Sequence, residues 1–349
     1  MGSVKDLDII RDPTERREGL GKFVFSDRYS VFDWGEMPDQ IPNKGAALCM
    51  IAAYLFEQAK RLDIATHYQG IADQKRGLID TSRIFQPTNT MLVKLVRVVR
   101  PEFKEGKYDY SAFHADLYHF LIPLEIIYRN QLLPGSRVSS RLDSGVVTLR
   151  QLGLDHRPES GEKLDPPILD VSTKLESEDR YLNWEEAQQI SGLSDLELKE
   201  VKKTLREVND LITYTAEKAG LVNLDGKIEL AYDPNGRLMV VDVFGTPDEC
   251  RFTFDGVNVS KEVAREFYKK TAWYEAVSRA KEEAKKQGST DWKALCTETP
   301  PSLPPELRET ISQMYTSIAN AFLERNLFDS SPLEEVVRKY QKWEKSKTN

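Results

Sequence analysis

The sequence contains little cysteine and histidine and has no long apolar run. Its three cysteines, Cys49, Cys250 and Cys296, are too far apart for a short metal-ligand motif and do not form a disulfide framework. The four histidines form no HExxH pattern. The longest apolar run, residues 46–56, is far shorter than the ~20 residues that span a bilayer. The first eight residues have no apolar core or cleavage signature, so we expect a cytoplasmic protein without membrane contact.

Charge and length narrow the class further. With 49 Lys and Arg against 56 Asp and Glu, the net charge is −7, which argues against a dedicated nucleic-acid binder. At ~150 residues per domain, the 349 residues suggest two domains or subdomains with room for a cleft. We expect an N-terminal α+β subdomain over residues 1–100 and a larger one over residues 101–349. An enzyme of this composition would rely on carboxylates, lysines and arginines.

Strand patterns lie mostly early in the chain and helix patterns late, which favours an α+β fold over a regular βαβ alternation. The expected strands cover residues 19–27, 91–100 and 121–129, and a Pro- and Gly-rich loop covers 157–167. The expected helices are residues 46–62, a helix capped by Ser194 and ended by Gly220, a helix over 261–287 capped by Ser260, and two helices near 306–325 and 333–345.

Two common nucleotide motifs are absent. There is no GxxxxGK[ST] and no GxGxxG sequence. The segment Gly19-Leu-Gly21-Lys22 is a weak glycine-rich turn, more typical of a plain hairpin bend. If this protein binds ATP, it does so without a P-loop.

The most informative segment is the expected hairpin over residues 221–245. Asn235-Gly236 predicts a two-residue type I′ turn, which places Glu229 directly opposite Asp242. Opposed side chains have Cβ atoms ~5 Å apart, so the two carboxylates would repel each other. A bound divalent cation such as Mg²⁺ would explain why two like charges are placed together. Lys227 shares a face with Glu229. A four-residue loop would leave these faces unchanged, and a three-residue loop would break the pairing. The alternative is a solvent-facing sheet surface without function.

A second group of residues suits a phosphate. Glu125 and Arg129 lie on one face of an expected strand, and Gly135-Ser136 follows with further arginines. A Gly-Ser step at a helix start offers N–H groups and a hydroxyl, and arginine adds charge. Arg251 could return to the same end of the hairpin. The alternative is a capped helix with exposed arginines.

Five ordered motifs between about residues 20 and 325 resemble the SAICAR synthetase family of purine biosynthesis. They are SDRYSVFD at 26–33, IPNKG at 41–45, the P-x-E-x-x-x-R pattern at 123–129 followed by Gly135-Ser136, D-x-K-x-E-L at 225–230, and D-x-x-x-T-P-D-x-x-R at 242–251.

The resemblance implies an ATP-dependent ligase with a two-subdomain fold related to ATP-grasp enzymes and a central ATP cleft. Its substrates would be ATP, L-aspartate and CAIR, the carboxylated aminoimidazole ribonucleotide. ATP would phosphorylate the CAIR carboxylate, and the aspartate amine would displace phosphate to give the amide SAICAR. Phosphoryl transfer of this kind requires metal ions and cationic groups on the developing charge.

The resemblance also implies roles for individual residues. Glu229 and Asp242 would hold Mg²⁺, and Lys227 would contact the ATP phosphates or the transferring phosphoryl group. The remaining roles fall into two sets: the CAIR side comprises Arg129, Ser136, Arg251, Glu125 and Arg28, and the carboxylate and aspartate pocket is bordered by Asp33 and Lys44.

The chain departs from the family pattern in several places. The N-terminal phosphate loop lacks its glycine, with Lys5 or Lys22 as substitutes, and Val243 replaces an acidic residue. The K-x-E…H-D segment at 174–179 has lost its histidine. One residue is inserted before Gly135-Ser136, and a C-terminal helix lies beyond the usual end. These departures fit a divergent branch, a paralogue that joins another acid and amine, or a non-catalytic homologue. The oligomeric state stays open.

Overall fold

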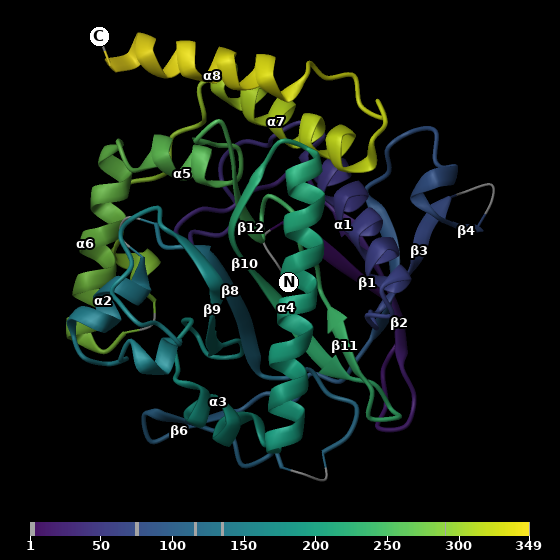
Figure 1. Ribbon diagram of the computed structural model, residues 1–349. Coiled ribbons are helices and arrows are strands. Elements are labelled where there is room, and N and C mark those ends of the chain that lie inside the picture. Colours follow the sequence, from purple (N-terminus) through teal and green to yellow (C-terminus); the bar gives the residue numbers. More distant parts are fainter. Residues whose placement is uncertain (1–3, 74–76, 115–116, 134–135, 290, 349) are drawn as a thin grey trace.

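The computed structural model describes residues 4–73, 77–114, 117–133, 136–289 and 291–348, apart from the side chains of Asp73 and Thr348. Helices and antiparallel sheets are mixed, as Figure 1 shows. The strands are β1 (Lys5–Arg11), β2 (Gly19–Phe25), β3 (Tyr68–Asp73), β4 (Gly77–Ile79), β5 (Thr90–Leu95), β6 (Glu102–Lys104), β7 (Lys107–Asp109), β8 (Leu124–Gln131), β9 (Lys163–Thr173), β10 (Val222–Tyr232), β11 (Leu238–Val241), β12 (Cys250–Phe254) and β13 (Val257–Asn258).

The helices lie between and after these strands. They are α1 (Lys44–Arg61), α2 (Arg137–Asp143), α3 (Trp184–Ser191), α4 (Asp195–Lys218), α5 (Glu262–Tyr268), α6 (Ala272–Gln287), α7 (Pro305–Leu323) and α8 (Leu333–Thr348), with short 3₁₀ turns at Thr81–Arg83, Arg150–Leu152 and Trp292–Leu295. None of the helices in the described ranges is both long and apolar enough to cross a membrane.

The first sheet has the order β1-β2-β5-β3-β4, and α1 packs against it. In β2, buried and half-buried residues alternate, which is the period of two expected of a strand with one covered face. Gly45 at the start of α1 packs tightly against β2, because a Cβ there would lie 2.8 Å from the backbone of Phe25. The expected strand over 19–27 and helix over 46–62 are therefore confirmed as β2 and α1.

The second sheet has the order β13-β12-β10-β8-β9, and β11 pairs with β10 as well. Every pair of neighbouring strands is antiparallel. Helix α4 lies against β8 and β10 (Figure 1). This sheet positions most of the charged residues singled out in the sequence, because β8 and β10 are neighbours at its centre.

The two sheets are joined by single backbone bridges and by a common core. Thr66 pairs with Val240, and Arg97 pairs with Phe120. One apolar cluster holds Phe23 of the first sheet together with Ile126 of the second. The proposed subdomain boundary near residue 100 stays a prediction.

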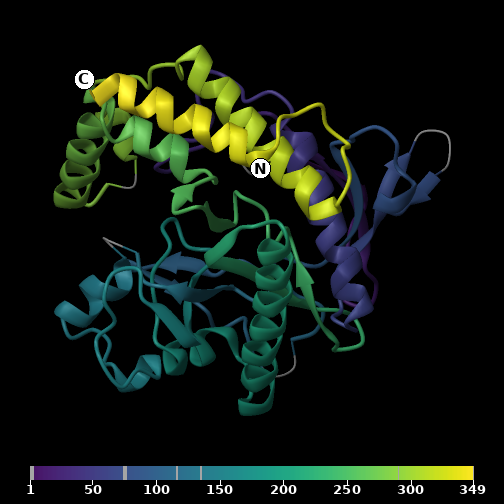
Figure 2. The same cartoon turned by 45° about the horizontal axis from the view of Figure 1, so that its top comes forward.

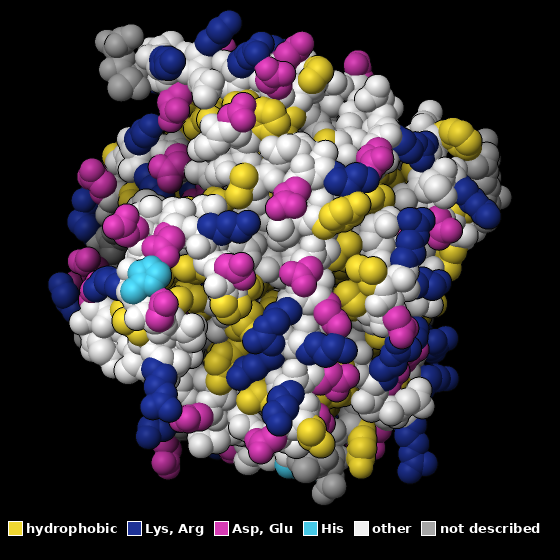
Figure 3. Space-filling model, in the orientation of Figure 1, with side chains coloured by type: hydrophobic (Ala, Val, Ile, Leu, Met, Phe, Trp, Pro, Cys, Tyr) yellow, Lys and Arg dark blue, Asp and Glu magenta, His cyan; other side chains and the backbone are white. Residues whose placement is uncertain are grey.

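The C-terminal helices form a layer of their own. Figure 2 shows α5 to α8 along one side of the molecule, with α2, α3 and α4 on the other. Helix α7 packs on α1, and α8 packs on α7. On the face seen in Figure 3, basic and acidic side chains are interspersed around apolar ones.

Helix boundaries agree with the sequence where capping is strong. Ser194 and Glu197 form a reciprocal capping box at the start of α4, and Gly220 ends it with a positive φ of 73°. The continuous helix expected over 261–287 is wrong. The chain breaks into α5 and α6, because the Thr271 hydroxyl donates to the carbonyl of Tyr268 and caps the amide of Tyr274. Lys261, and not Ser260, occupies the N-cap of α5.

Two further boundaries differ. The strand expected to reach residue 100 ends at Leu95. The expected loop over 157–167 overlaps β9, which begins at Lys163 and includes Pro166 and Pro167. Prolines are tolerated there because β9 is the edge strand of its sheet.

Candidate active site

Two motif loops meet at the start of α1. The carboxylate of Asp27 accepts hydrogen bonds from the backbone N–H of Asn43 at 3.1 Å and of Gly45 at 2.9 Å. Lys44 is buried, and its ammonium donates to the carbonyl of Arg28 at 3.3 Å and to Asp248 at 2.6 Å. The motifs at 26–33, 41–45 and 242–251 therefore form one structural unit.

The hairpin turn differs from the expected one. Glu229 pairs with Val241 and Tyr232 with Leu238, and the N–H of Asp233 donates to the carbonyl of Arg237 at 3.0 Å. Three residues, Pro234 to Gly236, therefore form the loop. A three-residue loop with Gly in the left-handed region adds one residue to the turn, and Gly236 has φ 75°. The prediction that Glu229 lies directly opposite Asp242 is wrong.

The two carboxylates nevertheless lie close enough to interact. Asp242 follows the end of β11 with φ 60°, which breaks the alternation of faces. Burial and the negative charge of Asp242 together raise the pKa of Glu229 above its ordinary range. The left-handed backbone at Asp242 thus allows the two carboxylates to interact although they are not paired in register.

Each carboxylate has a lysine as counter-ion. The Lys5 ammonium of β1 lies 2.5 Å from Asp242 Oδ1, and the Lys174 ammonium lies 2.6 Å from Glu229 Oε1. Burial alone would raise the pKa of Asp242, but the charge of Lys5 holds this pKa below its usual range. Lys5 therefore brings a positive charge from the N-terminal strand to the carboxylate pair.

Lys227 and Glu125 extend this charge network. The Lys227 ammonium lies 2.8 Å from Glu125 and 3.9 Å from Glu249. Lys174 also contacts Glu125, at 3.2 Å. Burial alone would raise the pKa of Glu125, but the charges of Lys227 and Lys174 lower it, so this carboxylate is ionised. The network therefore links β8, β10 and the segment after β9.

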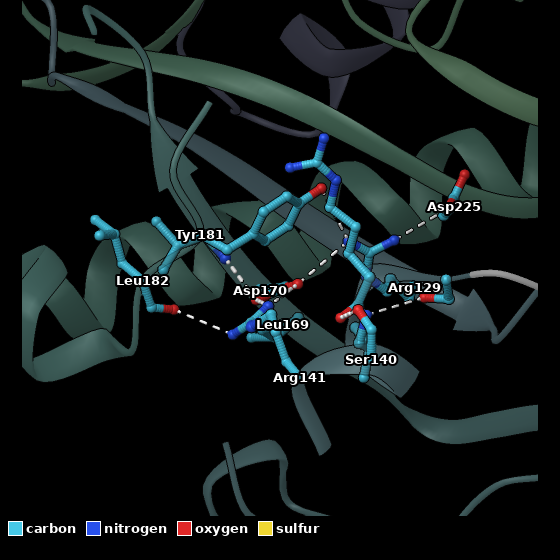
Figure 4. A network of polar contacts seen from close by, with 12 residues as sticks. Arg129, Ser140, Arg141, Leu169, Asp170, Tyr181, Leu182 and Asp225 are labelled. Atoms are coloured by element: carbon cyan, nitrogen blue, oxygen red, sulfur yellow. Dashed lines mark hydrogen bonds and ion pairs between the residues drawn. The ribbon is translucent and has the colours of Figure 1, made fainter. Parts of the chain in front are cut away.

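Arg129, Asp225 and Arg251 form a second cluster across three neighbouring strands. Asp225 pairs in register with Arg129 on one side and with Arg251 on the other. The Arg251 Nε donates to Asp225 at 2.8 Å, and Arg129 Nη1 lies 3.5 Å from the same carboxylate. Figure 4 shows Arg129 reaching toward Asp225. The two arginines expected to share a site are thus held together by one aspartate.

A second aspartate orders the other side of Arg129 (Figure 4). Asp170 of β9 is buried and accepts from Arg129 at 3.2 Å and from Arg141 at 2.9 Å. The guanidinium groups of Arg129, Arg137 and Arg141 lie 5.8, 5.5 and 5.1 Å from the centre of the Tyr181 ring. Arg129, Arg141 and Arg251 exceed Asp170 and Asp225 by one positive charge, and exposed Arg137 adds another.

Comparison with known proteins decides the family. The SAICAR synthetase family matches residues 14–286. This chain belongs to the SAICAR synthetase family. A protein of Archaeoglobus fulgidus, provisionally named a phosphoribosylaminoimidazole-succinocarboxamide synthase, is 48% identical over 97% of this chain and 98% of its own length. The synthase of Thermoplasma acidophilum is 31% identical over 85% of this chain and 90% of its own length.

Solved structures agree on the fold. SAICAR synthase from Saccharomyces cerevisiae, complexed with SAICAR, has a TM-score of 0.60 at 20% identity and covers 93% of each chain. A SAICAR synthetase in complex with ADP has a TM-score of 0.55 at 21% identity, covering 86% of this chain and 99% of that one. The expected α+β fold, related to ATP-grasp enzymes, is confirmed.

Within this family member, the residues expected at the nucleotide end separate into two groups. Lys5 contacts Asp242, whereas Lys22 lies on the opposite face of β2 from buried Phe23 and pairs with Asp8 at 3.5 Å. Lys5 packs over the Phe23 ring at 5.2 Å, on the buried face. Of the two proposed substitutes for the phosphate loop, the structure brings only Lys5 to the carboxylate pair.

The remaining expected residues lie around the site at different depths. Arg28 pairs with Asp6 at 2.7 Å. Asp33 is exposed, has φ 63° and pairs with Lys281 at 2.7 Å. Ser136 caps α2 by accepting from the amide of Val138 at 3.2 Å. Gly135 lies outside the described residues.

A magnesium ion fits the donor chemistry of Glu229 and Asp242. In the described part of the chain, no group of three or more His, Cys, Asp or Glu side chains is arranged for a metal. Mg²⁺ is commonly held by only one or two carboxylates, with phosphate oxygens and water completing its shell. Lys5 and Lys174 already offset the charge of these carboxylates, a task that a bound cation would share.

Several residues of the site were not expected from the sequence. Asp170, Tyr181 and Asp225 order the arginines, and His67 is buried with Nε2 at 2.9 Å from the carbonyl of Asp242. Asp225 could have been predicted, because it lies two residues before Lys227 and four before Glu229 and therefore shares their strand face. Asp170 and His67 carry no such signal, because their partners come from distant segments.

Proposed function

We propose that this SAICAR synthetase family member ligates L-aspartate to the carboxylate of CAIR at the expense of ATP, giving SAICAR, ADP and phosphate. The observation that carries the proposal is the row of charges on one face of β10. Asp225 lies in the arginine cluster, Lys227 lies in the lysine–glutamate network, and Glu229 lies beside Asp242. One strand face thus connects an anion-binding cluster to a carboxylate pair.

The spacing along this row suits a ribonucleotide. Asp225 and Glu229 are four steps apart along the strand, about 14 Å at ~3.4 Å per residue. We infer that Arg129, Arg251 and Ser136 bind the phosphate end of CAIR, with Arg137 as a further cation. The imidazole carboxylate then points toward Lys227 and Glu125. Arginine suits this task because its planar fork matches two phosphate oxygens.

The nucleotide end follows from the hairpin. Glu229 and Asp242 would hold Mg²⁺, which would supply positive charge to offset that of the ATP phosphates. Lys227 donates to the transferring phosphoryl group, Lys5 keeps Asp242 ionised, and Lys174 orients Glu229, whose charged form a bound cation would favour. A carboxylate oxygen of CAIR attacks the terminal phosphorus of ATP and ADP leaves. The aspartate amine then attacks the acyl carbon, and phosphate departs with that oxygen. The protein supplies position and charge rather than a covalent intermediate.

The proposal is tested by an ADP-release assay with CAIR, ATP and Mg²⁺ in which the amino acid is varied. We expect release that depends on both CAIR and L-aspartate, and mass spectrometry of the product should give SAICAR. Release with a different amine or acid would assign the site to another substrate pair. Nucleotide binding without release under any pair would make the chain a non-catalytic homologue, and either result overturns the proposal.

A further inference from the structure

A small cavity borders the lysine–glutamate network on the side of α5. Its volume is about 160 Å³, and its charged walls are Lys44, Lys227, Asp248, Glu249 and Lys261. Pockets for drug-sized ligands measure ~300–1,000 Å³, so this cavity suits a molecule of amino-acid size rather than a nucleotide. Because Lys227 is shared with the network, a molecule in the cavity lies next to the reacting groups.

Lys261 is the cavity lysine that makes no ion pair with a residue in the described part of the chain. Lys44 pairs with Asp248 and Lys227 pairs with Glu125. The Lys261 ammonium makes no hydrogen bond or ion pair with any residue in the described ranges, whereas its backbone N–H donates to the carbonyl of Pro247 and its carbonyl accepts from the N–H of Arg265, both at 3.2 Å. Burial lowers the pKa of Lys261, and the charge of Arg265 lowers it further, while the charges of Glu249 and Asp248 act against this shift. An anionic ligand would remove that penalty.

The cavity has acidic as well as basic walls. Asp248 and Glu249 line it together with Lys44, Lys227 and Lys261, so it offers partners to an amine as well as to an anion. Glu249 makes one ion pair within the described residues, a long one of 3.9 Å to Lys227. A molecule with a carboxylate at one end and an amine at the other satisfies both Lys261 and Glu249.

We propose that Lys261 binds a carboxylate of the amino acid that accepts the acyl group, while Glu249 accepts a hydrogen bond from its amine. This assignment rests on the proposed ligase function and names the site of its second substrate. It makes Lys261 a specificity residue, because an amine without a carboxylate would leave the half-buried ammonium without an anionic partner.

The test is the variant Lys261→Met, which keeps the length of the side chain and removes its charge. Loss of one charge-assisted hydrogen bond should raise the KM for L-aspartate by roughly ten- to a hundredfold. The KM values for ATP and CAIR should change by less than about twofold, because their contacts lie elsewhere. L-aspartate binding, measured by calorimetry in the presence of CAIR and a non-hydrolysable ATP analogue, should weaken by the same factor as KM rises.

Two control variants test the role of Lys261 separately from the proposed ligase function. Lys269→Met removes an exposed lysine just past the end of the same helix and should change none of the constants. Lys261→Arg should recover part of the aspartate affinity, and Lys261→Gln serves if the Met variant does not fold. An unchanged KM for aspartate, or equal losses for CAIR and ATP, would overturn the role of Lys261 while wild-type turnover still supports the ligase. Absence of wild-type turnover with aspartate would overturn the ligase itself.

Discussion

At the residue scale, Glu229 and Asp242 interact although the strand register does not pair them. Asp242 turns out of β11 at φ 60°, and Lys5 and Lys174 supply counter-charges from distant parts of the chain. A non-glycine residue in this region costs free energy, and such positions concentrate at functional sites. The buried carbonyl of Asp242 also has His67 at hydrogen-bond distance, which helps to hold the turned backbone.

Removing either carboxylate should abolish ligation without unfolding the protein. We expect Glu229→Gln and Asp242→Asn to lose turnover by about two orders of magnitude or more, because the proposed phosphoryl transfer needs a cation that these carboxylates would hold. Glu229→Gln should leave the melting temperature unchanged or slightly raised, because burial and Asp242 disfavour its charge, whereas Asp242→Asn should lower it, because Lys5 loses its counter-ion. Asp210→Asn on the exposed face of α4 is the control. Near-normal turnover of either variant at saturating Mg²⁺ would refute the metal assignment.

His67 should make stability sensitive to acid. Burial lowers the pKa of His67 from 6.5 to about 4, so the unfolded chain binds this proton more readily than the folded one. Its contribution to folding is therefore complete above pH ~6.5 and falls as the pH drops toward 4, by up to about 3 kcal/mol. His67→Gln, which keeps a donor near the carbonyl of Asp242, should flatten this part of the curve. Urea denaturation at several pH values measures the slope, and an unaltered slope in the variant would contradict the buried neutral imidazole.

At the element scale, strand β10 organises the site. It pairs with β8, β11 and β12, and one of its faces carries Asp225, Lys227 and Glu229. Gly226 lies between two of these residues on the opposite face. A Cβ at that position would lie 2.4 Å from the hydroxyl of Tyr128 and 2.6 Å from Cys250 Sγ. The close packing of β8, β10 and β12 thus depends on the absence of a side chain there.

Gly226→Ala should accordingly damage both stability and ligand binding. Because the neighbouring atoms lie in a packed core, we expect a loss of about 1–3 kcal/mol of folding free energy. Binding of CAIR should weaken as well, since Asp225 and Lys227 are displaced together. Thermal denaturation and CAIR titration report the two effects. A fully stable variant would show that the β10 contacts can relax without cost.

How far the sequence predicts these elements depends on whether the signals are local. The cap at Ser194 and the stop at Gly220 involve neighbouring residues, and α4 was predicted correctly. The loop at Pro234 to Gly236 was not, because Asn-Gly occurs in both two- and three-residue turns and Asp233 selects the longer one. Its side chain accepts from the amides of Asn235 and Arg237. Likewise, the break at Thr271 depends on a side-chain hydrogen bond that periodicity does not reveal.

At the scale of the whole molecule, the candidate site has two ends that distant segments assemble. The arginine cluster draws on β8, β9, β10, β12 and α2, and the carboxylate pair draws on β1, β10 and the end of β11. The sequence identified the residue types at both ends and pointed to Lys5, but not to Lys174, Asp170 or Asp225, which order the other side chains. Those partners are brought together only by the tertiary fold.

The two ends should respond separately to ligand titration. Arg251→Lys keeps the charge but loses the fork, so CAIR binding should weaken by roughly ten- to a hundredfold while ATP binding is preserved. Arg338→Lys, an exposed arginine of α8, is the matched control. Equal weakening of both ligands would assign Arg251 to the nucleotide end, and no change in either would remove it from the site.

The central claim is that this site activates the carboxylate of CAIR by phosphorylation before the amine attacks. It is tested most directly with CAIR whose carboxylate carries the heavy isotope of oxygen. During turnover with ATP, Mg²⁺ and L-aspartate, the phosphate released should contain one labelled oxygen, because that oxygen bonds to phosphorus when the acyl phosphate forms. Mass spectrometry of the phosphate measures the transfer, which should disappear in Asp242→Asn. Unlabelled phosphate released together with SAICAR would contradict the account.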